Sequence, residues 1–153
     1  MNTLKINIPE GFVIDKFDEK TGEVTFKNAP KEIKERIKTF EDVLNYHNIT
    51  QEAFDLECDA LEPDEIAYKK IKLIAKALNE DWVPDWTDGN WNKYYPWFKM
   101  GSPSGGGFSY LDYVYWRSAS NVGSRLCFKS SELAKYAGTQ FEDIYKDFLT
   151  INK

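Results

Sequence analysis

Apolar and polar side chains alternate at the beginning of the chain, which is the period of half-buried β-strands. One alternating run covers residues 4–8, and a second extended run at 12–14 follows a Pro-Glu-Gly turn. A further turn, Glu-Lys-Thr-Gly at 19–22, leads into a third run at 23–27. We therefore expect strands at 4–8, 12–14 and 23–27 that pair in antiparallel fashion.

The pattern changes to helical spacing between residues 30 and 79. Pro30 can occupy the first position of one helix, and Thr50 is an N-cap candidate for a short second helix ending near Glu57. Pro63 can begin a third helix that ends near Asn79. The apolar positions at three- and four-residue steps are Ile33, Ile37, Phe40 and Leu44 in the first helix and Ala67, Ile71, Ile74 and Leu78 in the third.

The second half of the chain returns to short strands. Residues 93–99 have the composition of a strand, although Pro96 restricts it to a sheet edge or a bulge. The glycine-rich segment GSPSGGG at 101–107 is typical of a hairpin loop. We expect two further strands at 108–116 and 125–129, joined by a polar turn.

A last helix is predicted from Ser130, which is its candidate N-cap. Gly138 in the helix interior costs about 1 kcal/mol relative to Ala. Phe141 is expected near the deepest part of the packed face, whereas Glu142 is expected to face solvent. The apolar stripe consists of Leu133, Ala137, Phe141, Ile144 and Phe148.

The order of elements is strands, helices, strands and helix, with connections of hairpin length between strands. This order predicts the α+β class, with antiparallel sheets and amphipathic helices packed on one face. The 153 residues fit a single domain. The pattern is compatible with a subdivision into a hairpin-plus-helix part at 1–62 and an aromatic-rich sheet with the C-terminal helix at 63–153.

The formal net charge of −5 is carried by the first eighty residues, which contain 12 basic and 17 acidic side chains. No basic stripe is present to neutralise phosphates, so nucleic-acid binding is disfavoured. Acidity peaks at 51–65, where seven carboxylates occur without Lys or Arg. Such a run is commonly a solvated face, but it can also form a surface for a basic partner. The residues of that acidic surface are Glu52, Asp55, Glu57, Asp59 and Glu62.

The chain has the pattern of a cytoplasmic protein without a membrane segment. Its start lacks a charged region followed by an apolar run, and no apolar stretch approaches the length of a membrane-spanning helix. Cys58 and Cys127 lie far apart and in different contexts, which suits reduced thiols better than a disulfide scaffold or a zinc site.

Motifs for catalysis, metals and cofactors fail on inspection. The 101–107 segment lacks the Lys of a phosphate-binding loop. If Gly89 were the sixth position of a calcium loop, the first and third would fall on Pro84 and Trp86, which have no ligating oxygen. His47 is the single histidine and has no nucleophile beside it in sequence. We therefore predict no cofactor, no metal site and no catalytic residue, and expect Asp81, Asp85 and Asp88 to cap turns.

The stretch 81–98 contains four of the five tryptophans. Exposed Trp and Tyr rings bind sugar faces or peptides, so this region can form a ligand platform. The competing interpretation is an aromatic core, because residues 81–116 contain one Leu, two Val and no Ile. We favour the core, with a minority of rings exposed for a partner. The candidate ligand-binding residues are Trp86, Trp91, Trp97, Trp116, Asp85, Asn90 and Arg117.

Three stretches resemble a recurrent, uncharacterised domain of small proteins encoded by phages, prophages and mobile elements of gut Bacteroidetes. They are KINIPEGFVIDKFDEKTGEVTFK, DWVPDWTDGNWNKYYPWF and SRLCFKSSELAKYAGTQFEDIYKDFL. The resemblance covers residues 4–27 and 63–150, with 28–62 as a variable insert. It implies an accessory or interaction protein without catalysis, and it assigns no functional residue.

These observations predict a non-enzymatic, phage-type interaction module with an unknown protein partner. One alternative is a carbohydrate- or peptide-binding module that uses an exposed Trp/Tyr surface, for which solvent-exposed, coplanar Trp rings would be the signature. Another is an acidic mimic of nucleic acid that binds a basic host protein, which requires the 51–65 carboxylates to share one face with other acids. An unrecognised hydrolase comes last.

Overall fold

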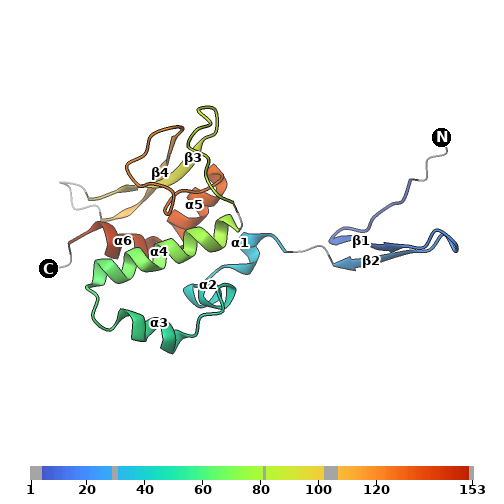
Figure 1. Ribbon diagram of the computed structural model, residues 1–153, viewed down its shortest axis with the longest axis horizontal. Helices are drawn as coiled ribbons and strands as arrows, with labels where there is room; N and C mark the ends of the chain where they lie inside the picture. The colour runs from blue at the N-terminus through green and yellow to red at the C-terminus, as the bar shows by residue number, and fades with distance from the viewer. Residues whose placement is uncertain (1–4, 29–30, 81, 102–106, 152–153) are drawn as a thin grey trace. The chain divides into compact units, whose positions relative to one another are not determined.

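The computed structural model of the chain describes residues 5–28, 31–80, 82–101 and 107–151. Contacts divide the chain into two compact units, Met1–Glu32 and Ile33–Lys153. The described residues contain six helices and two two-stranded antiparallel sheets, with helices packed on strands, which confirms the α+β class (Figure 1). The elements are β1 (Phe12–Phe17), β2 (Val24–Asn28), α1 (Ile33–Arg36), α2 (Phe40–Tyr46), α3 (Gln51–Cys58), α4 (Pro63–Asn79), β3 (Lys93–Lys99), β4 (Ser109–Trp116), α5 (Ser131–Gln140) and α6 (Glu142–Leu149).

The first unit is a β-hairpin formed by β1 and β2, which pair antiparallel as predicted. Its turn is held by Asp18, whose carboxylate accepts hydrogen bonds from the backbone N–H groups of Lys20 and Thr21 at 2.8 and 3.2 Å. The expected first strand at 4–8 is wrong for its described part, because residues 5–8 have no strand structure. Leu4 lies outside the described residues. Alternation favours a strand only where a neighbouring strand accepts its backbone hydrogen bonds, and no strand among the described residues pairs with residues 5–8.

The helix predicted from Pro30 is two helices, α1 and α2, and Pro30 itself lies outside the described residues. A capping box starts α2. The Thr39 hydroxyl accepts from the backbone N–H of Asp42 at 3.1 Å, and the Asp42 carboxylate accepts from the backbone N–H of Thr39 at 2.8 Å. These hydrogen bonds stabilise a new helix start at Thr39. The chain is therefore divided into α1 and α2, although the helical spacing of apolar residues continues through both. The predicted second and third helices are confirmed as α3 and α4.

The second sheet is the ribbon of β3 and β4, with a register shift between Trp97 and Phe98 beside Pro96, as predicted for a strand containing proline. The tip predicted at 101–107 lies outside the described residues for 102–106. The predicted strand at 125–129 is wrong, because only Phe128 makes a bridge to Tyr94.

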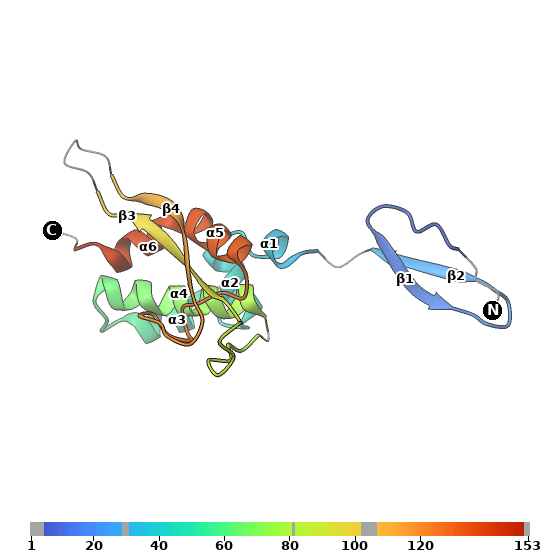
Figure 2. The same ribbon diagram turned by 90° about the horizontal axis from the view of Figure 1, so that it is seen from above.

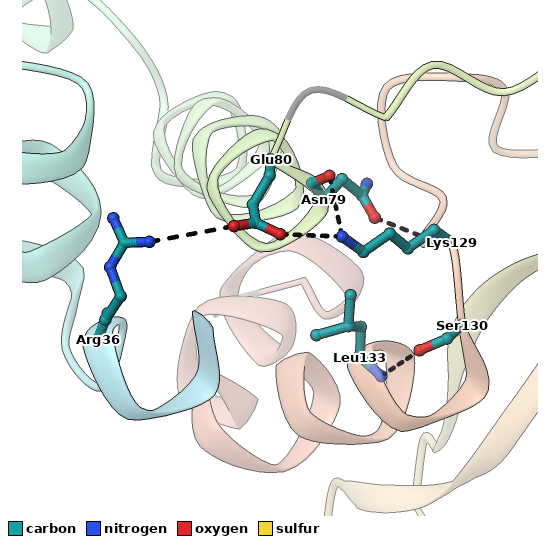
Figure 3. Close-up of polar contacts among 6 residues, drawn as sticks. All are labelled: Arg36, Asn79, Glu80, Lys129, Ser130 and Leu133. Atoms are coloured by element: carbon teal, nitrogen blue, oxygen red, sulfur yellow. Dashed lines mark hydrogen bonds and ion pairs between the residues drawn. The ribbon is translucent and has the colours of Figure 1, made fainter. Parts of the chain in front are cut away.

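The backbone beside Phe128 is bonded to a side chain instead of a strand. The Asn79 amide donates to the carbonyl of Cys127 at 2.7 Å and accepts from the backbone N–H of Lys129 at 2.9 Å. Lys129 also reaches Glu80 with its ammonium at 3.0 Å, and Glu80 lies 4.0 Å from Arg36 (Figure 3). The end of α4 therefore holds the segment that sequence periodicity assigns to a strand.

The predicted C-terminal helix starts as expected, with the Ser130 hydroxyl accepting from the backbone N–H of Leu133 at 3.2 Å (Figure 3). It is interrupted at Phe141, whose backbone angles of −118° and 30° separate α5 from α6. Glu142 does not face solvent as predicted. It is half-buried, and its carboxylate accepts a hydrogen bond from the backbone N–H of Tyr110 at 2.7 Å. This bond ties the start of α6 to β4.

The core of the second unit lies between its helices and the β3–β4 ribbon. Helix α5 packs against both strands, and α4 packs against α2, α5 and α6 (Figures 1 and 2). Tyr145 of α6 is fully buried at its centre, beside Phe98 and Tyr95 at ring-centroid distances of 4.8 and 6.2 Å. A smaller apolar cluster of Leu44, Phe54 and Cys58 joins α2 and α3.

Candidate functional site

The tryptophan-rich stretch encloses a buried lysine at the start of β3. The Lys93 side chain is fully buried. Its ammonium donates to the carbonyl oxygens of Asp88 and Arg117 at 3.2 and 2.9 Å. It also lies 5.3 Å from the ring centroid of Trp86 and 5.5 Å from that of Trp91, within the range of cation–π attraction. Two rings and two carbonyls therefore surround this cation, so both rings already have a partner within the chain.

Further contacts hold these rings in place. The indole N–H of Trp86 donates to the Ser124 hydroxyl at 2.6 Å. Trp91 meets Trp82 edge to face at a centroid distance of 5.5 Å. All three indole side chains are half-buried. The rings thus join the loop before β3 to the segment after β4, and they do not form a pair of coplanar exposed surfaces.

The polar residues predicted beside these rings serve the local backbone. Asp85 accepts from the backbone N–H and the hydroxyl of Thr87 at 2.8 and 2.7 Å, and these hydrogen bonds lower the pKa of the Asp85 carboxyl. Asp88 accepts from the backbone N–H of Asn90 at 2.8 Å. Turn capping is therefore confirmed for Asp85 and Asp88, while Asp81 lies outside the described residues.

Arg117 and Trp116 lie at the end of β4 beside the same loop. The guanidinium of Arg117 is exposed and donates to the Asn92 side chain at 3.3 Å. Trp116 pairs with Lys93 in the strand register, and its half-buried ring lies 6.3 Å from that of Tyr95. Of the predicted residues, Trp86, Trp91, Trp116, Asp85, Asn90 and Arg117 thus gather around one end of the ribbon.

Trp97 is separate from that cluster. It lies four residues beyond Lys93 on the same strand, which corresponds to about 13 Å at 3.3 Å per residue. Its side chain is 47% exposed, and it borders a surface groove with a volume of about 510 Å³ between α4, β3 and α6. The groove is lined by Tyr68, Tyr95, Pro96, Trp97, Phe98, Met100, Asn121, Val122, Leu126, Phe148 and Leu149.

The groove is apolar beside Trp97 and meets charged hollows beside Phe148. Phe148 also lines a hollow of about 400 Å³ that contains Glu62 and Asp64. Together with Tyr68 it lines a further hollow that contains acidic and basic side chains of α4. The surface therefore changes from aromatic to charged within the reach of a short peptide.

Two buried tyrosines are associated with this apolar surface, because Tyr95 lines the groove and the Tyr145 ring packs against the rings of Tyr95 and Phe98. Burial raises the pKa of Tyr95, which lines the groove, to about 12. Burial also raises the pKa of Tyr145 well above its ordinary value, and its hydroxyl has no hydrogen-bond partner among the described residues. Tyr95 therefore remains neutral over the physiological pH range and adds no charge to the groove lining.

Sequence reasoning missed Tyr68 and Met100 as groove residues and placed Phe148 only in the helix stripe. The sequence did contain an indication for Tyr68. This large aromatic residue directly follows Ala67 of the apolar face of α4, so it extends that face to one side. No local pattern distinguishes Met100, since its place at the groove depends on how β3 lies against α6.

The predicted acidic surface is divided between α3 and α4. Glu52, Asp55 and Asp59 are exposed and recur at three- and four-residue steps, so they share one solvent-facing side of α3 and its C-cap residue, Asp59. Glu57 forms an ion pair with Lys69 of α4. Glu62 precedes α4 and lines the hollow beside Phe148. One of the five carboxylates is thus neutralised within the chain.

The candidate nucleophiles are in unreactive settings. Burial raises the pKa of the Cys127 thiol to about 11, so the thiol remains protonated, and Cys58 is buried in the smaller apolar cluster. The His47 ring donates to the carbonyl of Leu73 at 2.9 Å. Within the described residues, no group of three His, Cys, Asp or Glu side chains is placed to hold a metal ion.

Among the described helices, none is both long and apolar enough to cross a membrane. Comparisons of the chain with models of protein families, with curated proteins and with solved structures give no match.

Proposed function

We propose that this protein is a non-catalytic interaction module that holds an apolar segment of a partner protein in the groove beside Trp97. The observation that carries the proposal is the groove itself, a hollow of about 510 Å³ whose lining is dominated by aromatic and aliphatic side chains. Its size lies within the range of about 300–1,000 Å³ that is typical of binding sites. An exposed Trp at the rim is the residue type most often found at the energetic centre of protein interfaces.

The charges beside the groove indicate the composition of the segment. The hollow next to Phe148 is lined by the carboxylates of Glu62 and Asp64, and no Lys or Arg is among its described lining residues. A basic side chain a few positions from the apolar anchor would meet these carboxylates. We therefore propose a segment that combines one large apolar or aromatic residue with a nearby Lys or Arg.

A sugar ligand has less support than a peptide. A surface that binds the face of a sugar needs exposed aromatic rings flanked by several hydrogen-bonding groups. The rings of Trp86 and Trp91 instead form cation–π contacts with Lys93. Asn121 is the only amide side chain among the described groove residues. The acidic-mimic alternative loses one of its carboxylates to the ion pair between Glu57 and Lys69.

The non-catalytic part of the proposal rests on the state of the thiols and the histidine. A thiol with a pKa of about 11, as at Cys127, holds almost no thiolate near neutral pH. The His47 ring nitrogen that bonds the Leu73 carbonyl is a donor there, so it does not act as a base toward a nucleophile. The resemblance to phage-encoded small proteins remains a separate prediction about origin.

The test is a selection of random displayed peptides on the immobilised chain, followed by fluorescence anisotropy with the selected peptides. We expect enrichment of an aromatic or large aliphatic residue near a basic residue. Trp97→Ala should weaken binding by about 30-fold or more, the usual effect of removing an interface hot spot. Tyr115→Ala is the matched control, because Tyr115 is similarly exposed, at 52%, and does not line the groove.

A second pair of variants tests the charged end. Asp64→Asn should weaken binding and reduce its salt dependence, whereas Asp147→Asn on the exposed face of α6 should leave both unchanged. Equal binding of the selected peptides to the wild-type chain and to the Trp97 variant would refute the groove as the site.

A further inference from the structure

The β1–β2 hairpin has one apolar face and one polar face. Strand pairing places Ile14 opposite Phe26 and Phe17 opposite Val24, and side chains of directly paired residues lie on the same face. Phe12 belongs to that face as well, two residues before Ile14. The opposite face carries Val13, Lys16, Thr25 and Lys27, with Lys27 bonded to Asp15 at 3.0 Å.

A β-bulge brings the large apolar side chains onto one face, where Asn28, paired with Phe12, is the polar exception. Residues 12, 14 and 17 do not follow a strict period of two, so a regular strand would turn Phe17 to the polar face. The register shift between Ile14 and Lys16 adds one residue, Asp15, to β1. This shift returns Phe17 to the face of Phe12 and Ile14. The local structure of the hairpin therefore assembles a continuous apolar face.

That apolar face is open to solvent. Phe12 and Ile14 are each 42% exposed, Phe17 is 53% exposed and Phe26 is 36% exposed. Among the described residues of the Met1–Glu32 unit, none is buried, so this unit has no core of its own. An isolated two-stranded hairpin is marginally stable in water unless a further layer covers its apolar face. The face therefore requires a covering surface.

We propose that this face is covered by the same face of a second copy of the chain, which forms a two-fold symmetric dimer of hairpins. Two copies of one apolar face can pack against each other about a two-fold axis, and isologous two-fold contacts are the commonest form of homo-oligomer. Stacking two such ribbons face to face gives a small β-sandwich with sheets about 10 Å apart.

Charge supports a second copy as the occupant. Residues 1–32 contain five basic and six acidic side chains, a formal charge of −1, so the remaining residues carry −4 of the total of −5. Two hairpins can therefore approach with almost no net repulsion between them. An acidic or basic partner would instead be matched by a face with a net charge of the opposite sign.

The available area fits a weak dimer. A buried Phe contributes about 150–250 Å², so exposures of 36–53% leave roughly 80 Å² at each Phe of the face. With Ile14 and Val24 on the same face, the exposed apolar area is about 350 Å² per copy and about 700 Å² for the pair. This is below the size of a standard interface and typical of a weak, transient contact, so we expect a dissociation constant on the order of 100 µM.

The experiment is sedimentation equilibrium of the full chain over a concentration series from about 1 µM to about 300 µM, a range that brackets the dissociation constant expected for an interface of this size. The mass should rise from 17.8 kDa toward twice that value. Phe26→Thr removes the central ring but introduces a β-branched residue that favours strands, and it should weaken dimerisation at least about 10-fold. Thr25→Ser is the matched control, because Thr25 is the adjacent exposed residue on the polar face and Ser adds no charge opposite Lys16, and this variant should dimerise like the wild-type chain.

A measurement on the unaltered chain covers the case in which the Phe26 variant loses the hairpin. In an equal mixture of ¹³C-labelled and unlabelled chain, isotope-filtered NOEs should connect Ile14 and Phe26 side chains of different copies. A wild-type mass of 17.8 kDa at every concentration would overturn the proposal. That result is expected if the apolar face is covered by another part of the same chain. Intermolecular NOEs confined to the polar face would overturn it as well.

Discussion

Replacing Gly138 with Ala should destabilise the protein, although Ala is the better helix former. Gly138 lies inside α5, where propensity alone favours Ala by about 1 kcal/mol. A Cβ atom at this position would lie 2.5 Å from Cδ2 of Tyr110 and 2.8 Å from Cβ of Pro96. Carbon atoms in contact are normally about 3.5–4.0 Å apart, so α5 and the ribbon would have to separate by about 1 Å.

The expected magnitude follows from two opposing effects. Inserting a methyl group into a packed region costs about 1–3 kcal/mol, and both neighbours here resist movement. Pro96 is a rigid ring within β3, and the backbone of Tyr110 is bonded to the Glu142 carboxylate at 2.7 Å. We therefore take the upper end of that range and subtract the gain in propensity. The net loss of unfolding free energy should be about 2 kcal/mol.

The assay is equilibrium urea denaturation followed by fluorescence. Gly89→Ala is the control, because the atom nearest to its added Cβ is the Ser118 hydroxyl oxygen at 3.5 Å, an ordinary contact. In a Tyr110→Ala background the penalty of Gly138→Ala should shrink, which a double-mutant cycle measures. An increase in stability of about 1 kcal/mol for Gly138→Ala alone would show that α5 and the ribbon are not in close contact.

Three further predictions address the core, the buried lysine and metals. Phe141→Ala should lower the free energy of unfolding by about 3–5 kcal/mol in denaturant melts. Asp143→Ala, on the exposed side of α6, should lower it by no more than about 0.5 kcal/mol. Equal, small effects of the two substitutions would mean that α5 and α6 pack loosely. Lys93→Met should cost about 2–4 kcal/mol and alter tryptophan fluorescence, because two carbonyls and two indole rings lose their cationic partner; an unchanged melt and spectrum would contradict the described contacts. Thermal melts with and without calcium or zinc should coincide, and a large saturable stabilisation would reveal a metal site.

Local signals were enough to predict most helices. Thr50 and Ser130 accept backbone hydrogen bonds at the starts of α3 and α5, and Pro63 occupies the first turn of α4. Each signal involves groups within four residues of one another, so it does not depend on where the segment packs in the folded protein. The same holds for the hairpin of β1 and β2, whose turn needs only Asp18 and the residues after it.

Tertiary contacts decided the remaining features because the partners are distant in sequence. Asn79 takes the backbone groups of residues 127 and 129, which periodicity assigns to a strand. Composition favoured an aromatic core for 81–98, and Tyr95 and Phe98 are indeed buried there, but it did not indicate that the half-buried rings of Trp86 and Trp91 would surround Lys93. The groove at Trp97 likewise needs α4, β3 and α6 together. A single sequence encodes each local preference, whereas the free energy of such contacts exists only once segments tens of residues apart are packed against one another.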